Sequence, residues 1–195
     1  MGRTASITRR TGETDILVEI DLDGTGRSDV KTGVGFFDHM LTALSRHSLI
    51  DMTLHVEGDT WVDDHHTVED TGIALGQAFR EALGDKAGIR RFGDALVPLD
   101  EALVMAAVDF SGRGELFWDV EIGPEKVGSF DTELGHEFFA GLARDAGMTL
   151  HLRKVTGDNA HHILEATFKA AARAIRAAVE PDPRVEGIPS TKGVL

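Results

Sequence analysis

The sequence predicts a mixed α/β (α+β) protein in which one strand-strand-helix-strand-helix unit occurs twice. Two pairs of related segments support this, because both repeat at one offset of 96 residues. The strand-like pair is Met52–Val56 (MTLHV) and Met148–Leu152 (MTLHL), and the helix-like pair is His65–Glu69 and His161–Glu165, both HHxxE. A fixed offset between related segments indicates an internal repeat. Because each unit would bury its helices against one face of its sheet, we expect a helical layer between two antiparallel sheets.

The chain of 195 residues is long enough for a single globular domain with a sizeable core. We predict a first repeat unit over residues 1–92 and a second over residues 93–180. Residues 181–195 hold three of the five prolines and are expected to form a terminal loop.

In the first unit, Asp15–Asp23 alternates apolar and polar residues, as a half-buried strand does. Gly24–Gly26 predicts the turn that follows. Phe36–Leu49 carries apolar residues at helical spacing, and Met52–Val56 alternates again as a second strand. His65–Leu83 is predicted to be a helix that ends at a glycine, the residue favoured just after helix C-termini.

Arg91–Asp94 is predicted to connect the two units. The second unit is predicted to contain, in order, strand Ala102–Phe110, its hairpin partner Glu115–Ile122, helix Thr132–Ala146, strand Met148–Leu152 and helix His161–Val179. The two units match closely from their second strand-helix pair onward and only loosely before it.

Composition limits the function classes. The residues are 42% hydrophobic and 27% charged, as in an ordinary globular protein, and the net charge of −13 argues against binding to nucleic acid or to anionic membranes. The chain has no cysteine, so any metal must be held by nitrogen and oxygen, which favours manganese, iron or zinc. Neither a secretory signal nor an apolar run of roughly 20 residues is evident, so we expect a soluble, cytoplasmic protein.

The repeated HHxxE segments predict a metal site. In a helix, a histidine and a glutamate three or four residues apart are neighbours, whereas two adjacent histidines point about 100° apart. One helix can therefore serve two metal ions, and each unit has another histidine upstream on a separate helix. The candidate ligands are His39, His65, His66, Glu69, His136, His161, His162 and Glu165. They divide into two sites of three histidines and one carboxylate, and each would leave two positions open on an octahedral ion.

Other residues near these segments have simpler interpretations. Asp63, Asp64 and Asp158 either cap the helices or orient the histidines, and we favour the capping role. His55 and His151 alternate with apolar residues on the matched strands, which predicts a position facing solvent or another subunit. His47 follows His39 by two helical turns and could reach a ligand held at the metal.

Five segments give the chain a resemblance to the imidazoleglycerol-phosphate dehydratase family, in its monofunctional form, over essentially its whole length. These segments are DHML (38–41), DDHHTVED (63–70), DFSGR (109–113), DNAHHILEATFKA (158–170) and PSTKGVL (189–195). The resemblance implies four helices packed between two four-stranded, mostly antiparallel sheets. It also implies a homo-oligomer of twenty-four subunits with active sites at subunit interfaces.

The resemblance further implies two Mn²⁺ ions per active site. One ion would be held by His65, His136, His161 and Glu165, and the other by His39, His66, Glu69 and His162. Helix spacing is compatible with this division, but spacing alone would not have selected it.

The implied reaction converts D-erythro-imidazole glycerol 3-phosphate to imidazole acetol phosphate and water, in histidine biosynthesis. The resemblance assigns substrate contacts to Glu13, His39, His47, His65, Glu69, Arg91, Arg113, His161, Lys169, Ser190 and Lys192. Four of these would hold the phosphate group, namely Arg91, Arg113, Ser190 and Lys192, so the terminal loop is expected to contribute to that site. Lys169 is a weaker candidate for the same role.

The implied chemistry begins with an imidazole ring bound to both metal ions, which favours its ionised form. The electron-rich ring can then expel the side-chain hydroxyl. Glu13 is assigned as the general base wholly by the resemblance, and His47 as the group that holds the departing hydroxyl.

Two other functions remain open at this point. A dinuclear metallohydrolase would use the metals to activate water against a phosphate ester. A metal-stabilised oligomer or storage shell would use the histidines structurally. Arg91, Arg113 and Lys192 argue against the shell, because it has no use for a phosphate pocket.

Overall fold

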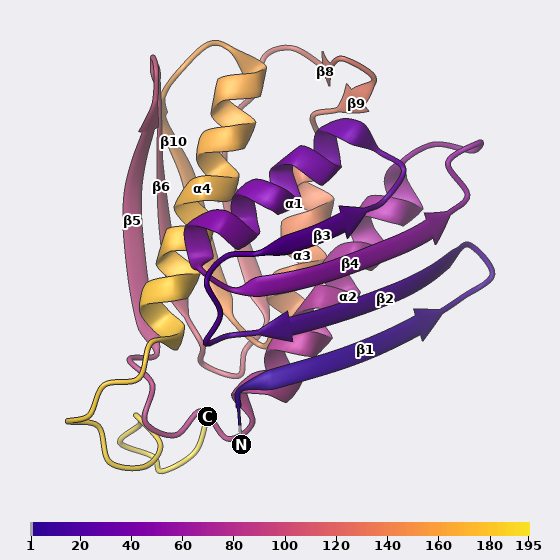
Figure 1. The fold of residues 1–195 in the computed structure, drawn as a ribbon. Helices are drawn as coiled ribbons and strands as arrows, with labels where there is room; N and C mark the ends of the chain where they lie inside the picture. The colour runs from indigo at the N-terminus through magenta and orange to yellow at the C-terminus, as the bar shows by residue number, and fades with distance from the viewer. Residues whose placement is uncertain (1) are drawn as a thin grey trace.

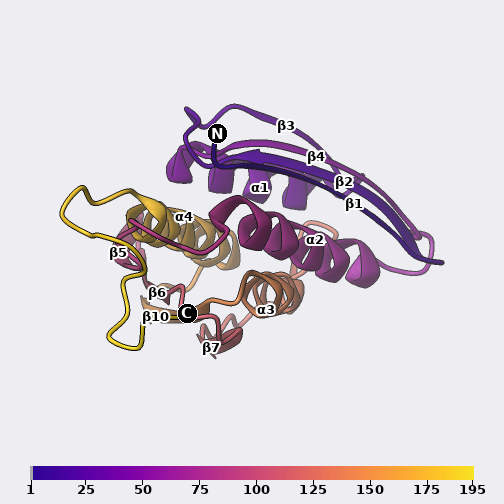
Figure 2. The ribbon, with the colours of Figure 1, turned by 90° about the horizontal axis from the view of Figure 1, so that it is seen from below.

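The computed structural model describes residues 2–195 and contains four long helices between two four-stranded sheets (Figures 1 and 2). The first half comprises β1 (Thr4–Arg10), β2 (Thr14–Asp21), β3 (Ser28–Lys31), α1 (Gly35–Ser48), β4 (Asp51–Gly58) and α2 (His65–Leu83). The second half comprises β5 (Phe92–Leu99), β6 (Ala102–Asp109), β7 (Glu115–Asp119), β8 (Lys126–Val127), β9 (Phe130–Asp131), α3 (Leu134–Ala146), β10 (Thr149–Thr156) and α4 (Ala160–Val179).

The two sheets have the same topology, which supports the inferred duplication. Their strand orders are β1-β2-β4-β3 and β5-β6-β10-β7. In each sheet the first three strands pair antiparallel, and the fourth pairs parallel to its neighbour. The expectation of two four-stranded, mostly antiparallel sheets is therefore confirmed.

The helices form a double layer between the sheets. The apolar faces of the helices and of the sheets pack together in one continuous core. Figure 2 shows α1 and α2 against the first sheet, and α3 and α4 on the side of the second. On β2, for example, Ile16, Val18 and Ile20 alternate with exposed or half-buried residues and face the helices.

Across the middle of the molecule, each half packs against the other half's helices. Helix α1 packs on α4, and α2 packs on α3. The second pair is especially close, since a Cβ at Gly72 would lie 2.3 Å from the Phe138 carbonyl oxygen and one at Gly76 would lie 2.8 Å from that of Leu142. The histidine upstream of each HHxxE segment thus lies on a helix that packs against the HHxxE helix of the other half.

Several sequence-based assignments of strands were wrong. In each half, three strands of the four-stranded sheet precede the first long helix, so the predicted repeat unit lacked one strand. Besides the short strands β8 and β9, the strands β1, β3 and β5 were not predicted. β5 includes Phe92–Asp94, which had been assigned to a connection. These three strands lie at sheet edges and expose much of their length, so they lack a strong apolar alternation.

The predicted hairpin of Ala102–Phe110 with Glu115–Ile122 was also wrong. β7 pairs parallel with β10, which lies between β6 and β7. Alternation along a strand reports which face is buried but not which strand lies beside it.

Among residues 2–195, no helix combines the length and the apolar character needed to cross a bilayer.

Candidate metal centre and active site

Both HHxxE helices begin at side chains that accept hydrogen bonds from their first turn. At α4 the Asn159 Oδ1 accepts from the backbone N–H groups of His161 and His162, at 2.9 and 3.2 Å. At α2 the Asp63 Oδ1 accepts from the N–H of His65 at 2.8 Å. Asp63 therefore has the predicted capping role. Asp64 occupies the N-cap position of α2 without a side-chain hydrogen bond to the helix, and Asn159 rather than Asp158 caps α4.

Three predicted ligands meet where α1 packs on the first turns of α4. His161 Nε2 lies 3.1 Å from Glu165 Oε2, and His39 Nε2 lies 3.4 Å from the same oxygen. The three ligand atoms lie within 4.8 Å of one another, which is a suitable arrangement for one metal ion. We call His39, His161 and Glu165 the α1–α4 trio.

Glu165 is held as a carboxylate. Burial would raise its pKa, but the hydrogen bond from Lys169 Nζ at 2.7 Å, with smaller contributions from His161 and His39, outweighs burial and lowers the pKa to about 2. Glu165 is therefore charged at neutral pH, as a ligand for a divalent cation must be.

The matching residues of α2 lie farther apart and are more exposed to solvent. His65 Nε2 lies 3.6 Å from Glu69 Oε2, and the Glu69 side chain is 34% exposed against 15% for Glu165. His66 Nδ1 lies 3.0 Å from Asp59 Oδ2, and its Nε2 lies 3.7 Å from Glu13 Oε1. Glu13 itself lies in the turn between β1 and β2 with its side chain 53% exposed.

The remaining predicted ligands, His162 and His136, also point Nδ1 at a carboxylate. The distances are 2.7 Å from His162 to Glu101 and 2.9 Å from His136 to Glu137. A carboxylate accepts hydrogen bonds, so Nδ1 carries the proton and Nε2 of a neutral ring keeps its lone pair. Metal-binding histidines characteristically show this arrangement. The donor set therefore fits a divalent metal with nitrogen and oxygen ligands.

Two of these contacts also change the proton affinity of the histidine rings. The hydrogen bond to Asp59 raises the pKa of His66, and the hydrogen bond to Glu101 raises the pKa of His162. Metal binding at these rings therefore competes with a proton.

The eight predicted ligands do not converge within one chain. Among residues 2–195, only the α1–α4 trio comes close enough to share an ion. The resemblance assigned His39 to a different ion from His161 and Glu165, whereas a single chain brings these three together.

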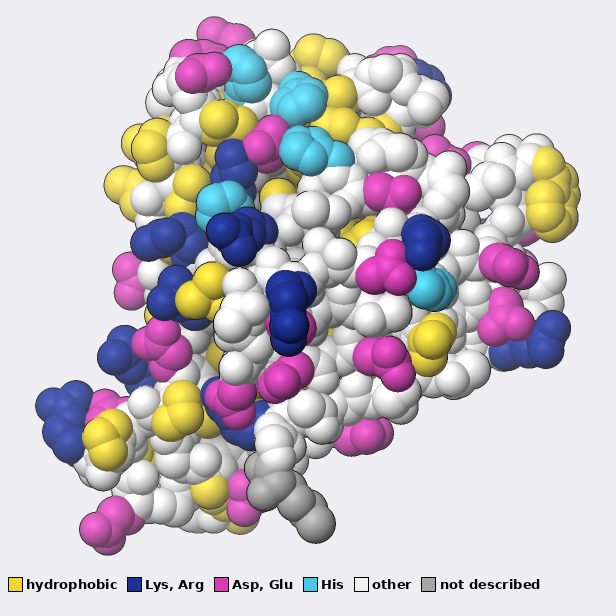
Figure 3. Space-filling model, in the orientation of Figure 1, with side chains coloured by type: hydrophobic (Ala, Val, Ile, Leu, Met, Phe, Trp, Pro, Cys, Tyr) yellow, Lys and Arg dark blue, Asp and Glu magenta, His cyan; other side chains and the backbone are white. Residues whose placement is uncertain are grey.

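A basic region adjoins the trio. Burial is the main cause that lowers the pKa of His47, followed by the charges of Lys169 and Arg173. His47 is therefore neutral at pH 7. Figure 3 shows histidine side chains beside lysine and arginine side chains on the face where α1 and α4 lie.

The predicted phosphate-binding residues gather at the other end of α4. Arg91 donates to both carboxylate oxygens of Asp109, at 2.7 and 3.1 Å, and to the Pro189 carbonyl at 2.9 Å. Arg113 reaches Asp109 at 3.7 Å, with its side chain 68% exposed. Asp109 thus holds the two arginines side by side.

The chain terminus follows the same surface. The Lys192 N–H donates to Ser190 Oγ at 3.2 Å, directly after the Pro189 contact. The Arg91 N–H donates to the carbonyl of Ala178 in the last turn of α4, 13 residues after Glu165. At roughly 1.5 Å per residue, that separates the arginines from the trio by about 20 Å along the helix (Figure 1). Within one chain, the trio and the arginines therefore lie at opposite ends of α4.

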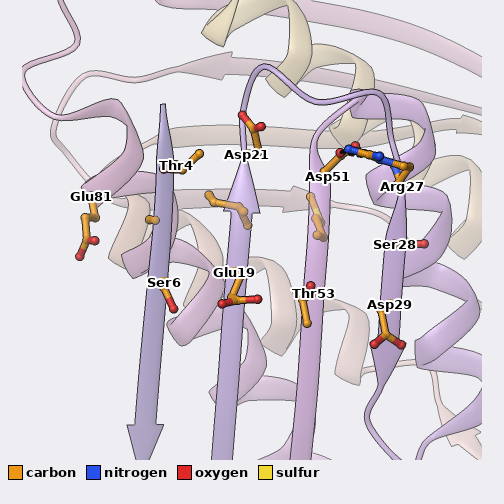
Figure 4. Close-up of a pocket in the computed structure, with 13 residues that line it drawn as sticks. Thr4, Ser6, Glu19, Asp21, Arg27, Ser28, Asp29, Asp51, Thr53 and Glu81 are labelled. Atoms are coloured by element: carbon orange, nitrogen blue, oxygen red, sulfur yellow. Dashed lines mark hydrogen bonds and ion pairs between the residues drawn. The ribbon is translucent and has the colours of Figure 1, made fainter. Parts of the chain in front are cut away.

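A shallow depression of about 720 Å³ lies elsewhere, on the outer face of the first sheet (Figure 4). Its lining includes Thr4, Glu19, Asp51, Thr53 and Arg27, and contains none of the predicted site residues. The depression is therefore separate from the candidate metal centre.

The sequence analysis missed Asp59, Glu101, Glu137 and Asp109. Asp109 lies within the DFSGR segment, so that segment was a signal for it. Glu101 is 61 positions before the histidine that it contacts, and nothing in the local pattern marks it.

Comparisons with known proteins identify the family of this chain. The family model described as imidazoleglycerol-phosphate dehydratase matches residues 32–175. Proteins of that name from Dinoroseobacter shibae and Paracoccus denitrificans are 63% and 62% identical over 194 residues, covering 99% of this chain and 100% of each relative.

Solved structures show the same fold. The dehydratase from Staphylococcus aureus matches with a TM-score of 0.84 and 38% identity, over 92% of this chain and 99% of that one. The enzyme from Pyrococcus furiosus matches with a TM-score of 0.84 and 41% identity, over 97% and 100%. The chain therefore belongs to the imidazoleglycerol-phosphate dehydratase family, whose members are hydro-lyases of histidine biosynthesis.

Proposed function

We propose that this enzyme carries out the metal-dependent dehydration of D-erythro-imidazole glycerol 3-phosphate to imidazole acetol phosphate. The observation that carries the proposal is the α1–α4 trio, in which two histidines direct Nε2 at an ionised, half-buried Glu165. Lys169 and the neutral His47 lie beside this trio.

Two Mn²⁺ ions are the proposed cofactor, because the donors are imidazole nitrogens and carboxylate oxygens and no thiolate is present. When bound, these ions would lower the N–H pKa of the substrate's imidazole ring and so make the ring electron-rich.

The chain's own residues have separate roles in the proposed reaction. His47 is neutral, so its ring N–H can donate a hydrogen bond to the departing hydroxyl group. The hydroxyl leaves as water after gaining a proton, which is balanced by the proton lost from the neighbouring carbon, and the resulting enol becomes the ketone by moving its O–H proton to carbon. Glu13 takes the proton from the neighbouring carbon. Its exposed carboxylate on the Nε2 side of His66 is free to approach a substrate.

The proposed active site lies between copies of the chain, in a homo-oligomer that the family resemblance puts at twenty-four subunits. The support is the separation of about 20 Å between the trio and the arginines at the other end of α4. A substrate bound to one chain's metal centre would take its phosphate contacts, at Arg91, Arg113, Ser190 and Lys192, from another chain.

The test is to incubate the manganese-loaded protein with imidazole glycerol phosphate and to measure acetol product and inorganic phosphate separately. We expect the acetol product without phosphate release. Phosphate release without acetol product would instead indicate a metallohydrolase, and an inert protein would favour a storage shell.

Glu13→Gln should keep its metal content and its mass in solution but lose at least a hundredfold in turnover, because an amide is not a base. Glu57→Gln, which alters an exposed glutamate on β4, is the matched control and should turn over normally. Near-normal turnover by Glu13→Gln would remove Glu13 as the base.

A further inference from the structure

Two carboxylates that do not belong to the predicted ligand set contact one histidine of each HHxxE pair. We propose that Asp59 and Glu101 are positioning residues that hold His66 and His162 with Nδ1 protonated and Nε2 open to a metal ion. This inference rests on the proposed metal-dependent function and specifies how its ligands are oriented.

The Asp59 contact is well defined. Both carboxylate oxygens lie near His66 Nδ1, at 3.0 and 3.2 Å, and the side chain of Asp59 is only 10% exposed. Its backbone is also anchored, since the Asp59 N–H donates to the Glu13 carbonyl and the Asp59 carbonyl accepts from Val62. A buried carboxylate is costly unless it is hydrogen-bonded, and the imidazole N–H supplies that bond.

Glu101 lies in the turn between β5 and β6 and is held by contacts at the start of α4. Its Oε2 lies 2.7 Å from His162 Nδ1, while its Oε1 accepts from the backbone N–H groups of Asn159 and Asp158, at 2.9 and 3.3 Å. One carboxylate therefore binds both the histidine and the residues that begin α4. This geometry couples the ring orientation of His162 to the start of its helix.

These contacts indicate which tautomer each imidazole ring adopts. In the neutral ring one nitrogen donates a hydrogen bond and the other accepts, and a partner that can only accept fixes the proton on the nitrogen that faces it. Because Asp59 and Glu101 only accept, they select the Nδ1–H form. In the trio, the nitrogen that faces Glu165 is Nε2 in both His39 and His161, which is the nitrogen that Asp59 and Glu101 leave free in the other two rings.

The two repeats reach this arrangement from different positions. Glu13 and Glu101 both stand directly before the second strand of their sheets, so they are structural counterparts. Only Glu101 contacts an Nδ1. In the first repeat Asp59, from the loop between β4 and α2, takes that role and leaves Glu13 on the Nε2 side at 3.7 Å. Removal of Asp59 should therefore weaken metal binding, whereas removal of Glu13 should affect turnover alone.

The experiment compares Asp59→Asn and Glu101→Gln with the matched control Asp29→Asn. Asp29 also binds a histidine, His55 Nε2 at 2.8 Å, but that histidine lies on β4 outside the ligand set. Free Mn²⁺ is followed by electron paramagnetic resonance while the assembled protein is titrated, and thermal unfolding is recorded for the metal-free proteins. An amide can donate to Nδ1 and so reverse the tautomer, which blocks Nε2.

We expect Mn²⁺ affinity to fall about 10- to 100-fold at one site in each variant and to stay unchanged in Asp29→Asn. Metal-free Glu101→Gln should remain folded during the titration, with an unfolding temperature somewhat below that of the wild type because an amide oxygen accepts more weakly from Asn159 and His162 than a carboxylate does. Excess Mn²⁺ should restore turnover in both variants, which it cannot do for Glu13→Gln.

Mn²⁺ affinities within twofold of the control would overturn the proposal, as would a loss that excess Mn²⁺ does not reverse. If Asp59→Asn does not fold, Glu101→Gln decides the matter, because the Glu101 side chain is 43% exposed and its replacement is tolerable. The metal titration does not depend on which reaction the enzyme catalyses, so failure here is distinguishable from failure of the dehydratase assignment.

Discussion

The two HHxxE helices share a motif but differ in what surrounds it. On α4, Glu165 is bound by Lys169 and approached by His39 and His161, while on α2 the carboxylate of Glu69 forms, among residues 2–195, an ion pair with His65 alone. The position that holds Lys169 on α4 holds Ile73 on α2, at the same offset of 96 residues. A duplicated motif therefore supplies two sets of candidate ligands, and the neighbouring helix determines how far each set is assembled within one chain.

Each HHxxE helix packs against a helix of the other half, and the side chains on that neighbouring helix explain the difference. Helix α1 carries His39 to α4, where it joins the trio. Helix α3 packs on α2 in the equivalent way, but its His136 Nδ1 is bonded to the adjacent Glu137 and its ring meets Trp118 edge-on. In a single chain the second repeat's HHxxE segment is therefore the more complete of the two.

The largest effect is expected from a comparison of Glu165→Gln with Glu69→Gln, which tests this asymmetry. Each should lower Mn²⁺ content and turnover at least a hundredfold, because each removes a proposed ligand. In the metal-free protein, however, Glu165→Gln should cost about 1–3 kcal/mol of unfolding free energy, because it leaves the mostly buried Lys169 ammonium without its carboxylate. Urea unfolding of the metal-free variants checks this, and equal stability losses at the two positions would contradict the asymmetry.

A smaller effect is expected at the helix caps. Asn159 accepts two backbone N–H groups and Asp63 accepts one, so Asn159→Ala should cost about 1 kcal/mol and Asp63→Ala less. Denaturant unfolding of both variants measures the difference. A larger loss for Asp63→Ala would show that the α2 segment is the better anchored of the two.

A third test concerns acid stability and compares the turns between the second and third strands of the two halves. Asp51 accepts from the N–H groups of Thr25 and Arg27, whereas the corresponding turn of the second half is closed by a backbone bond from Gly112 to Gly147. Burial would raise the pKa of Asp51, but the hydrogen bonds from Arg27 and Thr25 outweigh it and lower the pKa from 3.8 to about 2.

Because the folded pKa is depressed, this contribution to stability is complete above about pH 4 and is lost as pH falls toward 2. Asp51→Asn should therefore destabilise the protein by about 1 kcal/mol at pH 7 and make stability less dependent on pH between 4 and 2. Unfolding curves of wild type and variant across that range provide the measurement. A variant whose stability falls with acid as steeply as that of the wild type would rule Asp51 out as the titrating group.

Local patterns predicted the four helices and the central strands because burial of one face leaves a period of 3.6 or 2 in the sequence. They did not predict β1, β3 and β5, whose edge positions leave little apolar alternation. They also misassigned the partner of β7, since pairing depends on residues far along the chain.

The sequence by itself determined the duplication, the helical HHxxE segments and the restriction to nitrogen and oxygen ligands, because spacing and residue type are local properties. Only the tertiary structure decided that His39 meets Glu165, that Asp59 and Glu101 contact the second histidine of each pair, and that the arginines lie about 20 Å from the trio. Those contacts come from helix and strand packing between distant segments, and no local periodicity records which segments will meet.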